Sequence, residues 1–107
     1  MQKIRKDEAI AIVRQLKLKL QARGVPLQDI YLFGSFVNGS VHDWSDIDIA
    51  VVHDAFLDSP GKEKARLFEE GKDLDVRIEL LSFRPADFNN PYSSIAREVQ
   101  EHGTRVE

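Results

Sequence analysis

Cysteine is absent from the chain, which excludes disulfide bonds and metal sites built on thiolates. Long apolar runs are absent too, and none approaches the roughly 20 residues that a membrane-spanning helix needs. The first ten residues, MQKIRKDEAI, lack the apolar segment of a secretion signal. We therefore expect a soluble cytoplasmic protein with no membrane contact.

Neither sign of charge predominates in the sequence. The 15 basic and 18 acidic residues are mixed along the chain and leave a net charge of −3. Proteins that bind duplex nucleic acid usually carry a basic stripe, so we expect no direct duplex binding. The 107 residues suit a single domain, residues 1–107, with one modest core.

Hydrophobic residues follow both helical and strand periods. Over residues 7–23 they recur every three to four positions, and Gly24 suits the position that ends a helix. Alternating or wholly apolar runs predict strands. The mixture predicts an α+β (mixed α/β) fold, a small mixed sheet flanked by helices. The expected order is a helix at 7–23, strands at 30–34 and 46–52, a helix near 62–70, a strand at 74–83, a helix at 90–103 capped by Ser93 or Asn90, and a short strand at 104–107.

Two aspartates stand at alternate positions where the second predicted strand begins, in DIDIAVV. Residues i and i+2 of a strand face the same side, so Asp46 and Asp48 project together. Two Mg²⁺ ions held this way are the usual clamp for displacement at phosphorus. Mg²⁺ prefers a few carboxylates plus substrate phosphates. The pair predicts a magnesium site.

A glycine-serine pair closes the first predicted strand, in IYLFGS. Gly34 has no Cβ, so its backbone can approach a ligand closely and adopt positive φ. Ser35 offers a hydroxyl and a backbone N–H near the start of an expected helical turn, where anions bind well. If the two strands are neighbours, a phosphate cradle lies beside the metal ligands.

The stretch GSFVNGSVHDWSDID resembles the signature of the DNA polymerase β-like nucleotidyltransferase superfamily, a glycine-serine pair followed after ten residues by two alternate aspartates. The closer resemblance is to the minimal nucleotidyltransferases, which include antitoxins paired with HEPN-domain toxins. It extends to WSDIDIAVV, RIELLSFRPADF and IAREVQEHGTRV. It implies the palm-like nucleotidyltransferase fold, a two-ion Mg²⁺ site, and ATP as substrate.

By this resemblance Gly34 and Ser35 hold the triphosphate, and Asp46 and Asp48 hold the metal ions. A third carboxylate from the neighbouring strand completes the family's site and helps to deprotonate the attacking hydroxyl. In DLDVRIELL that position falls on Glu79.

Strand parity places Asp75, Arg77 and Glu79 on one face, so Asp75 remains an alternative third carboxylate.

The spacer departs from the family pattern. Asn38 stands where an arginine is frequent, and His42 where another basic residue is frequent. The missing cation bears on nucleotide affinity rather than on metal binding. His42 is a weak candidate for a phosphate contact, and Trp44 suits core packing better than base stacking.

The resemblance implies a Mg²⁺-dependent nucleotidyltransferase that moves AMP from ATP to a hydroxyl, such as a tyrosine of a partner HEPN toxin, and so acts as an antitoxin. Two alternatives remain open. One is a non-catalytic module that neutralises a HEPN-type partner by covering it. The other is the nucleotide-binding half of a split enzyme that modifies small molecules.

Overall fold

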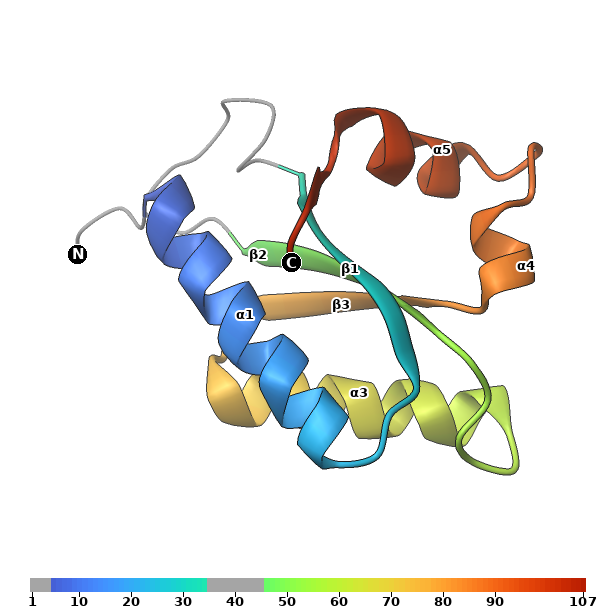
Figure 1. The fold of residues 1–107 in the computed structure, drawn as a ribbon, viewed down its shortest axis with the longest axis horizontal. Coiled ribbons are helices and arrows are strands. Elements are labelled where there is room, and N and C mark those ends of the chain that lie inside the picture. The colour runs from blue at the N-terminus through green and yellow to red at the C-terminus, as the bar shows by residue number, and fades with distance from the viewer. Residues whose placement is uncertain (1–4, 35–45) are drawn as a thin grey trace.

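A four-stranded mixed sheet lies at the centre of the computed structural model, which describes residues 5–34 and 46–107 (Figure 1). The strand order is β3-β2-β1-β4. Strand β1 runs antiparallel to both β2 and β4, whereas β2 and β3 are parallel. This architecture confirms the predicted fold class. The elements are α1 (Lys6–Ala22), β1 (Leu27–Phe33), β2 (Ile47–His53), α3 (Pro60–Leu74), β3 (Ile78–Phe83), α4 (Pro85–Phe88), α5 (Ser94–His102) and β4 (Thr104–Arg105).

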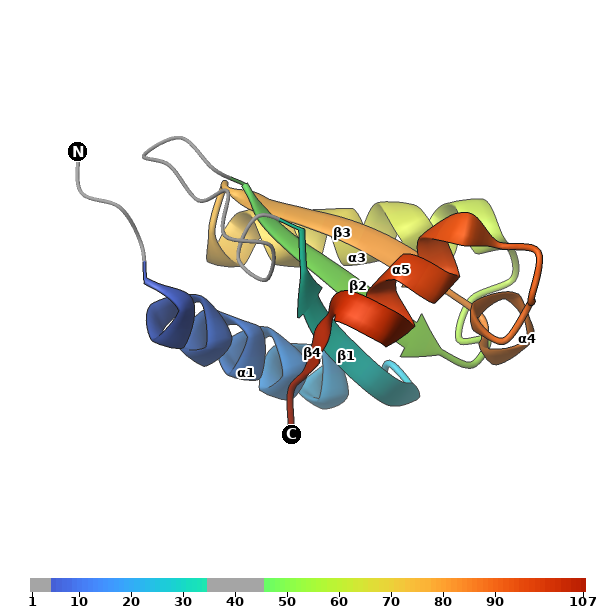
Figure 2. The same cartoon turned by 90° about the horizontal axis from the view of Figure 1, so that it is seen from above.

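Helices cover the sheet from both sides (Figure 2). Helices α1 and α3 pack on one face, where alternate strand residues such as Ile30, Leu32 and Ile49 join the larger buried cluster. Helices α4 and α5 pack on the other face, against residues that include Val52 and Phe83. The alternation follows from the strand geometry, because successive side chains point to opposite faces. Glu79 on β3 belongs to neither cluster.

Most predicted elements are present, with shifted ends. Gly24 ends α1 as expected, with φ of +83°. Ser93 caps α5 by accepting a hydrogen bond from the N–H of Ala96. The third strand begins at Ile78 rather than at residue 74, because α3 continues to Leu74. Helix α4 was not predicted, and the helical turn expected after residue 35 lies outside the described residues.

Helix α3 connects the two parallel strands. Because β2 and β3 run in the same direction, their first residues lie at the same end of the sheet. The loop before α3 and the start of α4 lie at the other end (Figure 1). The polar groups of the two ends are therefore separated by the length of the strands.

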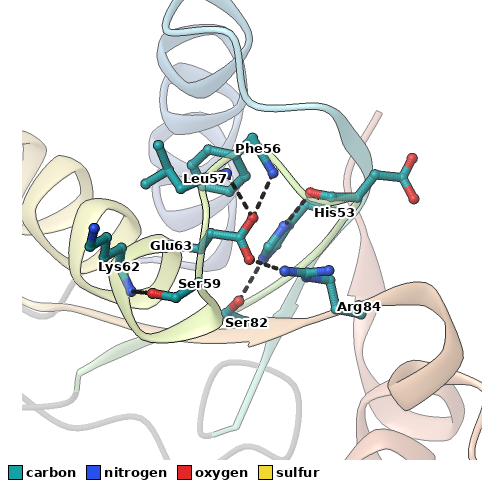
Figure 3. A network of polar contacts seen from close by, with 9 residues as sticks. His53, Phe56, Leu57, Ser59, Lys62, Glu63, Ser82 and Arg84 are labelled. Carbon is teal, nitrogen blue, oxygen red and sulfur yellow. Dashed lines mark hydrogen bonds and ion pairs between the residues drawn. The ribbon is translucent and has the colours of Figure 1, made fainter.

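A buried carboxylate organises the end of the sheet away from the aspartates (Figure 3). Glu63, 1% exposed, accepts hydrogen bonds from the N–H groups of Phe56 and Leu57 at 2.6 and 3.1 Å and pairs with Arg84. Beside it, the Nε2 of His53 lies 2.6 Å from the Ser82 hydroxyl. This network joins the loop before α3 to the ends of β2 and β3.

No helix within residues 5–34 and 46–107 is long and apolar enough to cross a membrane.

Candidate active site

Asp48 and Glu79 are direct neighbours across two strands. In the parallel pairing of β2 with β3, Asp48 stands in register with Glu79. Residues in register project from the same face of the sheet, so the side chains of Asp48 and Glu79 leave their strands on the same side. That side is opposite to α1 and α3, since the flanking Ile47, Ile49 and Ile78 belong to the cluster under those helices. Because β3 is the edge strand, a residue of α3 can still reach the Glu79 carboxylate around the edge.

Gly34 lies against Asp48 from the other neighbouring strand. Phe33, the last residue of β1, pairs with Asp48, so the turn at residue 34 begins beside this carboxylate. A Cβ on Gly34 would clash with the Asp48 carboxylate oxygen and lie 3.0 Å from its Cγ. The φ of Gly34 is +73°, which L side chains rarely adopt. Only glycine satisfies both conditions here.

Asp46 is exposed and directly precedes β2, and its charge acts on Asp48. Burial raises the pKa of Asp48 above the ordinary range of a carboxyl group, and the negative charges of Asp46 and Glu79 raise it further. Like charges held close disfavour ionisation, and a bound cation relieves this. The structure therefore places Glu79 beside Asp48, and Asp46 near enough for its charge to act on Asp48.

The Glu79 carboxylate is held by a lysine of α3. Its Oε1 lies 3.1 Å from the Nζ of Lys72, which also donates to the carbonyl oxygen of Val76 at 2.9 Å. Sequence reasoning missed Lys72. No local sequence pattern indicates the contact of Lys72 with Glu79, because it depends on how α3 turns into β3.

Asp75, the alternative third carboxylate, lies in the connection between α3 and β3. It is the residue that ends α3, before β3 begins. Its carboxylate accepts hydrogen bonds from the backbone N–H, Nε and an Nη of Arg77 at 2.9, 3.0 and 2.7 Å. The Arg77 side-chain hydrogen bonds are the largest cause of the lowered pKa of Asp75. This pairing engages both carboxylate oxygens of Asp75 with the Arg77 side chain.

The donor set fits Mg²⁺, since Asp46, Asp48 and Glu79 offer only carboxylate oxygens. Among residues 5–34 and 46–107, no group of three His, Asp or Glu side chains is already gathered as a metal site. Mg²⁺ does not require such a cage, because it binds through one or two carboxylates, waters and substrate phosphates. Ser35, Asn38, His42 and Trp44 lie outside the described residues, so their expected roles stay predictions.

The sequence profile of the nucleotidyltransferase domain family matches residues 13–105. Among individual relatives, the chain is 29% identical over 104 residues to a probable protein adenylyltransferase MntA of Haemophilus influenzae, covering 95% of this chain and 88% of the relative. It is 37% identical over 87 residues to the protein adenylyltransferase MntA of Shewanella oneidensis, covering 80% of this chain and 56% of the relative. It thus spans little more than half of the second relative.

Solved structures agree on the fold. A toxin-antitoxin crystal structure with AMP-PNP superposes with a TM-score of 0.63 at 28% identity, over 90% of this chain and 70% of that one. A structure of the toxin-antitoxin MntA-HepT gives a TM-score of 0.57 at 21% identity, over 89% of this chain and 68% of that one. At 21% identity, the MntA-HepT structure shows a likeness of fold alone.

Proposed function

This chain belongs to the nucleotidyltransferase domain family, and we propose that it transfers AMP from ATP to a hydroxyl group of a partner protein. The observation that carries the proposal is the arrangement of Asp48 in register with Glu79, with the backbone of Gly34 against Asp48. Carboxylates on adjacent strands beside a glycine turn are what a triphosphate and its metal ions require.

In this proposal the three carboxylates bind the metal ions, and the glycine-serine pair binds the triphosphate. Asp46 and Asp48 would hold a pair of Mg²⁺ ions, and Glu79 would complete the ligand set. Gly34 lets the backbone approach the triphosphate, and Ser35 binds it. Bound Mg²⁺ would supply neutralisation of the phosphate charge.

The chemical step exchanges one bond to the α-phosphorus for another. The acceptor oxygen forms its bond while the bond to the pyrophosphate oxygen breaks, and a carboxylate oxygen of Glu79 takes the hydroxyl proton. The chain contributes mainly by positioning these groups and by electrostatics.

We propose that the acceptor is a tyrosine hydroxyl on a HEPN-domain toxin, and that the chain acts in the cytoplasm as an antitoxin. Support comes from the relatives, two of which are named protein adenylyltransferases and which match 95% and 80% of this chain. A further similar structure is a toxin-antitoxin with AMP-PNP, at 28% identity.

A second candidate, a non-catalytic antitoxin, is favoured by one feature. Asn38 stands where an arginine is frequent in the family, so a positive charge that would strengthen nucleotide binding is missing at this position. Neutralisation would then rest on complex formation alone.

Co-expression with the protein encoded by the neighbouring gene separates the two. We expect the pair to co-elute, and the intact mass of the partner to rise by one or more AMP units. The Asp46→Asn/Asp48→Asn variant should co-elute without this increase, whereas Asp58→Asn, an exposed control, should retain it. Co-elution without a mass change would support the non-catalytic candidate, and failure to co-elute would contradict both.

A further inference from the structure

Lys72 is held on three sides at the edge of the carboxylate cluster. Its Nζ lies 2.9 Å from the carbonyl oxygen of Val76, 3.1 Å from the Oε1 of Glu79 and 5.5 Å from the ring centre of Phe68. The carbonyl and the ring fix the ammonium group independently of Glu79.

This pair differs from an ordinary surface ion pair. Lys62, on the same helix, pairs with Asp58 at 3.0 Å, and its side chain is 65% exposed. The side chain of Lys72 is 26% exposed and that of Glu79 is 49% exposed, against 71% for Asp58. Reduced exposure weakens solvent screening, so the charge of Lys72 acts more strongly on its carboxylate.

A metal ion and Lys72 would require the same carboxylate. The Oε1 of Glu79 accepts a hydrogen bond from Lys72, so a cation at this oxygen would compete with the ammonium group, whose charge also repels it. Lys72 also offsets one of the negative charges around Asp48. Both effects weaken metal binding to the carboxylates alone.

We propose that Lys72 is a positioning residue that competes with the divalent metal for Glu79, so that tight metal binding requires the phosphates of the nucleotide. The inference rests on the proposed function of the same site. Phosphate oxygens bring both ligands and negative charge, which compensate for the carboxylate held by Lys72. The lysine thus couples metal loading to nucleotide loading.

Mn²⁺ titration, followed by loss of the electron paramagnetic resonance signal of the free ion, tests the competition. The titration uses a double-mutant cycle of Lys72→Met and Glu79→Gln in the whole chain without nucleotide. In the chain with Glu79 intact, Lys72→Met should tighten Mn²⁺ binding about threefold to tenfold. In the Glu79→Gln background it should change Mn²⁺ affinity by less than about twofold.

Two variants guard the interpretation. Lys62→Met removes a lysine charge from the same helix and should leave Mn²⁺ affinity unchanged. Lys72→Gln removes the charge but keeps a hydrogen-bond donor, and serves if Lys72→Met does not fold, as judged by circular dichroism. Either Lys72 variant is expected to give the same tightening.

Unchanged or weaker Mn²⁺ binding by the folded Lys72 variant would overturn the competition, and so would equal tightening with and without Glu79. A failure of the proposed function would give a different result in the same titration. If Asp48→Asn leaves Mn²⁺ binding intact, the carboxylates are not the metal site, whatever Lys72 does.

Discussion

Gly34 and Asp48 are packed so closely that residue 34 can carry no side chain. A Cβ there would lie 3.0 Å from the Cγ of Asp48 and closer still to its oxygen. The glycine turn and the start of β2 are therefore packed directly against each other. Substitution of the glycine should act on the aspartate as well as on the turn.

Gly34→Ala should abolish binding of a non-hydrolysable ATP analogue with Mg²⁺ in calorimetry, because the methyl group displaces the Asp48 carboxylate. Gly24→Ala is the matched control, since Gly24 also has positive φ, at +83°, but has nothing within 4 Å of an added Cβ. Both variants should lose about 1–2 kcal/mol of unfolding free energy from backbone strain. Equal loss of binding would mean that strain, not Asp48, is responsible.

Glu79→Gln should lower the AMP transfer rate by at least about 100-fold while the fold stays intact, because it removes a ligand and a proton acceptor at constant volume. Asp75→Asn should leave the rate within about twofold but lower the unfolding free energy by about 1 kcal/mol, because it weakens the pairing with Arg77. Initial rates and urea unfolding measure the two effects. The reverse ranking of rates would assign the third carboxylate to Asp75.

The stability of the protein should depend on Glu63 in acid. Burial alone raises the pKa of this carboxyl, but hydrogen bonds from the N–H of Phe56, from Arg84 and from the N–H of Leu57 outweigh it and hold the pKa at about 2. Because the pKa is depressed in the folded state, the stabilisation is present above the unfolded value of 4.5 and is lost as pH falls towards 2.

Unfolding free energies of the wild type and Glu63→Gln, measured from pH 6 to pH 2, should therefore converge as pH falls through this window. Glu69→Gln, on the exposed side of α3, controls for the loss of one charge from the helix. A gap between wild type and Glu63→Gln that stays constant down to pH 2 would contradict the assignment.

The alternation of Asp46 and Asp48 at the start of an apolar strand predicts that they face one side. The prediction that the glycine turn lies beside this strand start agrees with the pairing of β1 with β2, which places Gly34 against Asp48. The choice between Asp75 and Glu79 was not available from the sequence, because parity puts both on one face of a long strand. Strand β3 begins only at Ile78, because α3 runs to Leu74 and the Asp75 side chain binds Arg77.

The contact of Lys72 with Glu79 was also beyond sequence reasoning. It joins the last turn of a helix to the second residue of a strand, across a connection whose geometry local propensities do not specify. The short helix α4 was missed for a related reason, since Pro85 suits both the end of a strand and the first turn of a helix.

Calorimetry of the protein with Mg²⁺ and a non-hydrolysable ATP analogue tests the central claim most directly, that the carboxylates at the start of β2 bind metal together with a nucleoside triphosphate. The wild type should bind the analogue with Mg²⁺ and more weakly with EDTA, and Asp46→Asn/Asp48→Asn should lose the Mg²⁺-dependent part. Asp54→Asn/Asp58→Asn, which removes two exposed carboxylates, should bind as the wild type does. Equal binding by Asp46→Asn/Asp48→Asn and the wild type would contradict the account.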